Sequence, residues 1–156
     1  MAACVDTSTE DPLDAELNDK VYSLACAVSR QHEARLSVLH AWKMKDEALL
    51  RVRLKSKVLD TFVQSTYDHR KLLLSKFLKQ FRTTDIEKDV HLIKGAAPEA
   101  VGEFIAENDV DLVVMGTIAR SGLFGLIIGN TAEKILEKIE CSVLALKPYG
   151  FKCPIK

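Results

Sequence analysis

Short apolar segments alternate along this chain with longer stretches in which apolar residues recur every three or four positions. Short apolar runs bounded by turn residues are typical of strands buried in a parallel sheet, and the longer periodicity is typical of helices. The pattern therefore predicts an α/β fold with five parallel strands in an open, doubly wound sheet, with helices on both faces. The predicted strands are Ala2 to Val5, Arg35 to Trp42, Ile86 to Lys94, Leu112 to Met115 and Ser142 to Leu146.

Helix signals fill the stretches between these segments. Asp11 and Pro12 are a capping acid and a first-turn proline, and they predict a helix that runs to about Glu33. A second helix is predicted from Ala97 to Asn108. The stretch from Lys43 to Arg82 contains no Gly or Pro and is predicted to be mostly helical. An apolar stripe from Val58 to Phe81 predicts a long helix lying on the sheet, after the basic run from Arg51 to Lys57.

The segment from Asp111 to Lys147 has the pattern of a strand, a glycine-rich loop, a helix and a second strand. Gly116 ends the first strand, and further glycines up to Gly129 leave the loop backbone open to a phosphate. Asn130 is predicted as the helix N-cap, with Glu133 at the spacing of a capping box. A glycine-rich loop that leads into a helix N-terminus is a generic anion site.

Composition removes several classes of function. The 22 basic and 22 acidic residues cancel, so no overall positive field would draw the protein to nucleic acid or to a membrane surface. No apolar run approaches the roughly 18 residues that a spanning helix needs, and no leader pattern precedes the first strand, so a cytoplasmic protein is expected. The four cysteines lie far apart without metal-ligand spacing, so no metal site is predicted.

Individual polar residues admit two interpretations each. Asp6 follows the first strand, where ligands of parallel α/β sheets bind, but an aspartate there also commonly accepts hydrogen bonds from loop N–H groups. His40 invites a catalytic interpretation, although a histidine near a strand end is more often a core residue. The basic run from Arg51 to Lys57 is interpreted as a solvated face rather than a phosphate site.

The segment from Asp111 to Lys147, the motif GAAPEA from Gly95 to Ala100 and the run NDVDLVVMG resemble the universal stress protein family. The resemblance covers nearly all of the chain and implies a domain over 1–147, a short tail over 148–156 and the strand order 3-2-1-4-5. The ending also resembles that of the second half of a tandem universal stress protein, and the abrupt first strand at Met1 suits a fragment of a longer chain.

Nucleotide-binding members of the family have a glycine, two residues, a second glycine, nine residues, and then a glycine followed by Ser or Thr. Here that frame falls on Gly116, Ala119, Gly129 and Asn130, so two positions depart from the pattern. A methyl group at Ala119 costs roughly 1 to 2 kcal/mol if the backbone there is left-handed. An Asn130 side chain that caps the helix would compete with a phosphate. The resemblance thus implies a degraded nucleotide site, with ATP or ADP as weak ligands.

The resemblance implies a ligand site at the carboxyl ends of the strands, in which Ala41 would lie against an adenine. The predicted cofactor-binding residues are Asp6, Ala41, Met115, Gly116, Ala119, Arg120, Gly129, Asn130 and Thr131.

Three functions remain open. The preferred one is a non-catalytic stress-response domain that dimerises and binds ligands or partners. The alternatives are an ATP-binding universal stress protein that acts as a nucleotide-dependent regulator, and a slow ATP hydrolase or self-phosphorylating protein. The sequence lacks the P-loop, GxGxxG, HExxH and GxSxG motifs, so the corresponding enzyme classes are not supported. Dimerisation is expected through an apolar edge formed by the last strand, with Val143 and Leu144 near the two-fold axis. A neighbouring domain would take the second copy's place in a tandem protein.

Overall fold

The computed structural model describes residues 1–9, 11–81, 83, 85–117 and 128–149. A five-stranded parallel sheet with the order β3-β2-β1-β4-β5 forms its centre, as predicted. The strands are β1 (Ala2–Cys4), β2 (Leu36–Trp42), β3 (Lys88–Lys94), β4 (Leu112–Gly116) and β5 (Ser142–Leu146). The helices are α1 (Pro12–His32), α2 (Glu47–Arg53), α3 (Ser56–Leu78), α4 (Ala97–Glu107) and α5 (Asn130–Leu136).

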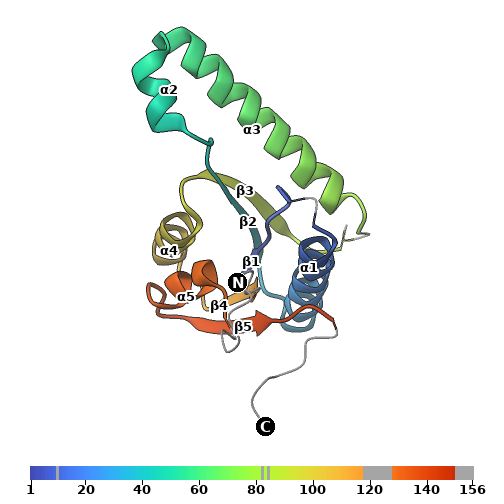
Figure 1. Cartoon of the computed structure of the whole chain (residues 1–156). Coiled ribbons are helices and arrows are strands. Elements are labelled where there is room, and N and C mark those ends of the chain that lie inside the picture. The colour runs from blue at the N-terminus through green and yellow to red at the C-terminus, as the bar shows by residue number, and fades with distance from the viewer. Residues whose placement is uncertain (10, 82, 84, 118–127, 150–156) are drawn as a thin grey trace.

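Helices cover both faces of the sheet, which confirms the doubly wound architecture (Figure 1). On one face, α1 and the last part of α3 pack on a buried cluster that includes Val38 and Val114. On the other face, α4 and α5 pack on a cluster that includes Leu39 and Val113. Neighbouring residues of one strand thus pack in the two clusters on opposite faces of the sheet, because successive side chains of a strand point to opposite faces.

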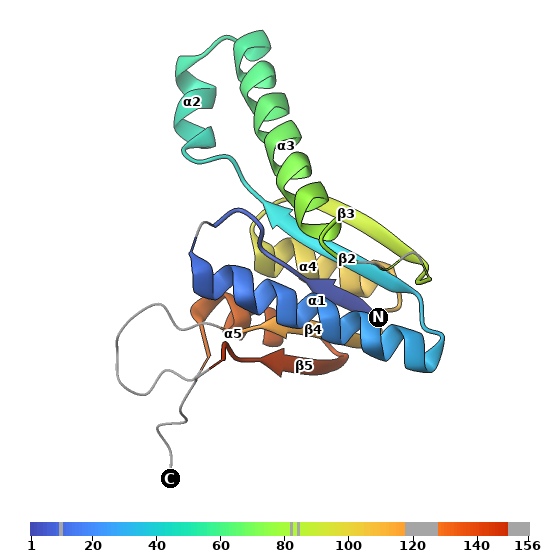
Figure 2. The same ribbon diagram turned by 90° about the vertical axis from the view of Figure 1, so that its right-hand side faces the viewer.

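The stretch from Lys43 to Arg82 is mostly helical, as predicted, and the predicted long helix is α3, which the short helix α2 precedes. The chain leaves α2 at Leu54 in an extended conformation, with φ −107° and ψ 150°, and α3 begins at Ser56. The last part of α3 packs on the sheet through Leu74 and Phe77, which corrects the prediction that the whole helix lies on the sheet. In the first part of α3, Leu59 is buried outside that cluster and Phe62 is 52% exposed. Figure 2 shows α2 and the first part of α3 projecting beyond the sheet.

The dimensions of the two elements explain this projection. A helix of 23 residues is roughly 34 Å long at 1.5 Å per residue. The seven residues of β2 span only about 23 Å at 3.3 Å per residue. An apolar stripe along α3 therefore extends past the surface that the sheet offers to it.

Glu47 of α2 links the base of this projection to the sheet. Its carboxylate accepts hydrogen bonds from Lys94 Nζ at 2.7 Å and from Arg51 Nη2 at 2.8 Å. These hydrogen bonds lower the pKa of Glu47, and the hydrogen bond from Lys94 has the largest effect. Arg51, at the start of the basic run, is thus engaged in a surface ion pair.

The predicted division into a domain over 1–147 and a tail over 148–156 stays a prediction, because most of the tail lies outside the described residues. Up to Tyr149 the chain follows α1: Tyr149 N–H donates to Glu16 Oε1 at 2.8 Å, and Lys20 Nζ donates to Lys147 O at 2.8 Å. None of the helices in the described ranges is long and apolar enough to cross a membrane. Within those ranges, no group of three or more His, Cys, Asp or Glu side chains is placed to hold a metal ion. Cys4, Cys26 and Cys141 are free thiols, and Cys153 lies outside the described part of the chain.

Candidate functional site

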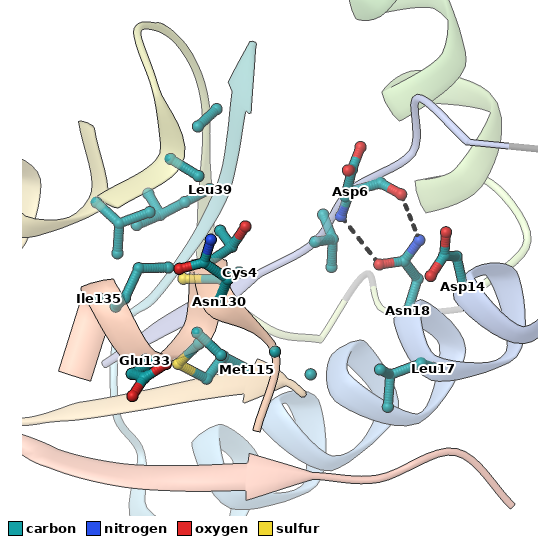
Figure 3. A pocket seen from close by; sticks show the side chains of 18 residues that line it. Cys4, Asp6, Asp14, Leu17, Asn18, Leu39, Met115, Asn130, Glu133 and Ile135 are labelled. Carbon is teal, nitrogen blue, oxygen red and sulfur yellow. Dashed lines mark hydrogen bonds between the residues drawn. The ribbon is translucent and has the colours of Figure 1, made fainter. Parts of the chain in front are cut away.

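A cavity of about 660 Å³, here called the first cavity, opens at the carboxyl ends of the central strands (Figure 3). Strand ends supply its floor, and α1, α4 and α5 supply its walls. Ligands of parallel α/β sheets bind at this edge. The residues used below are Cys4, Asp6, Asp14, Leu17, Asn18, Ala41, Met115, Gly116, Gly129, Asn130, Thr131 and Glu133.

Seven of the nine predicted site residues line the first cavity together. They come from the end of β1, from β2, from β4 and from the start of α5, and they are Asp6, Ala41, Met115, Gly116, Gly129, Asn130 and Thr131. Ala119 and Arg120 lie outside the described residues. The parallel arrangement brings these separate segments together at the carboxyl ends of the strands, because every strand of the sheet ends on the same side.

Asp6 is held in place by Asn18 of α1. Asp6 N–H donates to Asn18 Oδ1 at 2.9 Å, and Asn18 Nδ2 donates to Asp6 O at 2.7 Å (Figure 3). The Asp6 carboxylate accepts hydrogen bonds from the backbone N–H of Ser8, at 3.0 Å, and from its hydroxyl. Asp6 therefore accepts hydrogen bonds from the loop after β1 and also lines the first cavity, so both interpretations of this residue apply.

The sequence interpretation did not identify Asn18. The only sequence feature that pointed to Asn18 was its place as a polar residue beside Leu17 on the apolar face of α1. In the structure Asn18 is 9% exposed. A buried amide requires hydrogen-bond partners, and here the loop after β1 supplies them.

Gly116 has a packing role that does not depend on any ligand. A Cβ atom added there would lie 2.4 Å from Leu17 Cδ2 and 2.7 Å from Leu17 Cγ. Leu17 is buried, so its side chain cannot turn away without a cost in packing. The glycine thus lets α1 approach the end of β4.

Asn130 is not the N-cap of α5, which corrects the sequence prediction. The cap residue is Gly129, with φ −73° and ψ 149°, and no side chain caps this helix. Glu133 N–H donates to Gly129 O at 3.0 Å, and Asn130 is the first helical residue. The proposed competition between a capping Asn130 and a phosphate is therefore wrong. With seven residues, α5 is only about two turns long, so its dipole is small.

The charged side chains of the first cavity are acidic. Asp6, Asp14 and Glu133 line it, and no Lys, Arg or His occurs among its described lining residues. Asp14 is only 8% exposed. The described lining of the first cavity thus offers carboxylates, and no basic side chain, to a polyphosphate.

His40 is a core residue, in agreement with the non-catalytic interpretation. It is fully buried, and its Nδ1 lies 3.0 Å from Val5 O. Burial lowers its pKa, and this effect outweighs the hydrogen bond to Val5, which raises it. A histidine enclosed in this way does not reach the first cavity, whose lining does not include it.

A second cavity, of about 530 Å³, adjoins the first one and shares with it Asp6, Ala41, Ala97, Asn130 and Thr131. Its remaining wall includes Ser8, Trp42, Lys43, Arg70, Glu99 and Lys134. Arg70 comes from α3 and is about 30 residues from Trp42 in the sequence, the nearest strand residue in this wall. No motif in the sequence connects Arg70 with this edge of the sheet; only the packing of α3 brings it there.

The model of the universal stress protein family matches residues 13–147. Among curated proteins, universal stress protein E of Photorhabdus laumondii is 30% identical over 100% of this chain and 49% of its own length. The chain spans about half the length of such curated relatives.

Solved structures give the same result. A functionally unknown protein from Pseudomonas aeruginosa PAO1 matches 94% of this chain and 46% of its own, with a TM-score of 0.71 and 26% identity. A universal stress protein solved in complex with cAMP matches 94% of this chain and 95% of its own, with a TM-score of 0.50 and 18% identity, a likeness of fold alone. Because the family model covers most of the chain and the strand order agrees with the resemblance, this chain belongs to the universal stress protein family.

Proposed function

We propose that this chain is a non-catalytic ligand-binding domain of the stress response, which binds a nucleoside-like ligand weakly in the first cavity. The convergence of seven predicted site residues on one cavity supports a ligand there. The acidic lining supports a preference against triphosphates, because Asp6, Asp14 and Glu133 line the same cavity as Gly116 and Gly129. Membership of the family supports the role in stress.

The structure of a relative with bound cAMP supports a small-molecule ligand for a domain of this fold. That ligand belongs to the relative, and its class comes to this chain only as part of the proposal. The burial of His40 away from the first cavity supports a non-catalytic domain, since a general base must reach the reacting group. The cytoplasmic location expected from the sequence stays a prediction.

The proposal is tested by calorimetric titration with ATP and magnesium. We expect the native chain to bind with a dissociation constant above roughly 100 µM, which corresponds to less than about 5.5 kcal/mol of binding free energy. Asp14→Asn should bind ATP more tightly than the native chain, because it removes one carboxylate from the cavity lining. Asp19→Asn, an exposed position on the same helix, is the matched control and should bind like the native chain.

Three results would contradict the proposal. Submicromolar binding of ATP by the native chain, or ATP in the purified protein, would favour the ATP-dependent regulator. Turnover of radiolabelled ATP would favour the slow hydrolase.

The departure from the family pattern at Ala119 gives a separate prediction: Ala119→Gly should improve the binding of ATP. This position lies outside the described residues.

Assembly is a further part of the proposal. β5 forms one edge of the sheet, so its outer backbone groups are available to pair with another strand. We expect a homodimer, or pairing with a neighbouring domain, through β5 with Val143 and Leu144 close to the axis.

A further inference from the structure

The second cavity lies where five separate segments meet. The loop after β1 contributes Ser8, the chain just after β2 contributes Lys43, α3 contributes Arg70, the start of α4 contributes Glu99, and α5 contributes Lys134. Its shared wall with the first cavity means that one ligand of nucleotide size can occupy both. The combined site is thus longer than the cavity at the strand ends.

The two cavities differ in charge. Lys43, Arg70 and Lys134 line the second cavity together with the acids Asp6 and Glu99. Glu99 accepts a hydrogen bond from Lys138 Nζ at 2.9 Å, and this pairing offsets its charge. The balance is therefore positive in the second cavity, whereas the described lining of the first cavity carries only acidic side chains.

Arg70 is oriented toward this site by the loop after β1. Its Nη1 donates to Ser8 O at 3.4 Å, and the residue is half-buried. A guanidinium carries five N–H donors in a planar fork, so one long hydrogen bond leaves donors for a phosphate or carboxylate. A guanidinium can donate two parallel hydrogen bonds to one phosphate or carboxylate, which favours bidentate binding of an anion.

We propose that the second cavity is an anion subsite, which binds the phosphate of a nucleoside monophosphate through Arg70, Lys43 and Lys134 while the nucleoside occupies the first cavity. This inference rests on the proposed function for the nucleoside, but the anion subsite is separable from it. It places the anionic end of the ligand away from Gly116 and Asp14, which line the first cavity but not the second. A monophosphate fits such a site better than a triphosphate, because one anionic group meets the basic wall and none meets the acidic one.

The test compares AMP with adenosine by calorimetry without magnesium and at low salt. The native chain should bind AMP roughly fivefold to tenfold more tightly than adenosine, the effect expected of a few partly solvated ion contacts. Arg70→Gln with Lys134→Gln should remove this preference and leave the affinity for adenosine unchanged. The matched control, Arg53→Gln with Lys57→Gln, removes the same charge from the basic run and should keep the preference.

A second variant guards against disruption of the loop by loss of Arg70. Lys43→Gln with Lys134→Gln leaves the hydrogen bond to Ser8 intact and should lower the preference for AMP at least twofold. Equal binding of AMP and adenosine by the native chain would overturn the proposal. So would a preference that survives in both site variants, or one that the control loses.

If neither adenosine nor AMP binds, the proposed function fails, and inorganic pyrophosphate then tests the anion subsite alone. We expect the phosphorus resonance of pyrophosphate to broaden with the native chain and with the control, and to stay sharp with Arg70→Gln and Lys134→Gln. Absence of broadening with the native chain, or broadening that only the control abolishes, would overturn the subsite.

Discussion

At the scale of single residues, the close approach of Leu17 to Gly116 makes a quantitative prediction. Gly116→Ala should destabilise the protein by about 1 to 3 kcal/mol, because the added methyl group meets buried Leu17 atoms at 2.4 and 2.7 Å. In a double-mutant cycle with Leu17→Ala, the combined loss should be smaller than the sum of the single losses by about 1 kcal/mol. Urea unfolding monitored by circular dichroism measures all four proteins.

Gly102 provides a control of opposite sign. A Cβ there would lie 3.5 Å from Lys138 Cβ, an ordinary contact, and the residue is inside α4. Gly102→Ala should therefore stabilise the protein by about 0.5 to 1 kcal/mol through helix propensity. Equal losses at Gly102 and Gly116 would show that the contact with Leu17 is not the cause.

At the scale of elements, α3 should divide into a packed end and an exposed end. Phe77 is 8% exposed and packs edge-on against Tyr22, with ring centroids 5.6 Å apart. Phe77→Ala should thus cost about 3 to 5 kcal/mol in urea unfolding. Phe62→Ala makes the same chemical change at a position that is 52% exposed, and it should cost less than about 1 kcal/mol.

Amide hydrogen exchange should show the same division, with stronger protection near Phe77 than near Phe62. A large loss of stability in Phe62→Ala would contradict the projecting arrangement of α3 and would mean that a second surface covers this end in solution. The exposed end offers Val58 and Phe62, which are 43% and 52% exposed.

At the scale of the whole molecule, the two edges of the sheet should behave differently. We expect the native chain to sediment as a dimer joined through β5, and Val143→Asp should shift it toward the monomer, because it places charges at a paired apolar edge. Val90→Asp makes the same change on β3, the opposite edge strand, where Val90 is 47% exposed, and it should leave the dimer intact.

Val143 also packs partly on the core of α4 and α5, so loss of folding is a separate effect that must be checked by circular dichroism. Ala145→Asp tests the same edge at an exposed position of β5 and should weaken the dimer without a packing loss. A native chain that stays monomeric at high concentration would contradict pairing through β5.

The linear pattern of the chain determined its elements. Apolar runs as short as Leu112 to Met115 identified strands, and the periodicity from Leu13 to Val28 identified α1, because both signals are local in sequence. The position of Asp6 and Gly116 after strands was enough to bring them to one edge, since parallel strands all end on the same side. The strand order itself followed from the family resemblance.

Only the tertiary structure decided which surfaces meet. Periodicity reports that a helix has an apolar face but not how far the sheet beneath it extends, so the projection of α3 was not foreseen. The pairing of Asn18 with Asp6 and the arrival of Arg70 at the second cavity join segments 12 and 62 residues apart at the loop after β1. Such contacts depend on the packing of whole helices against the sheet, and no local pattern of residue types records that packing.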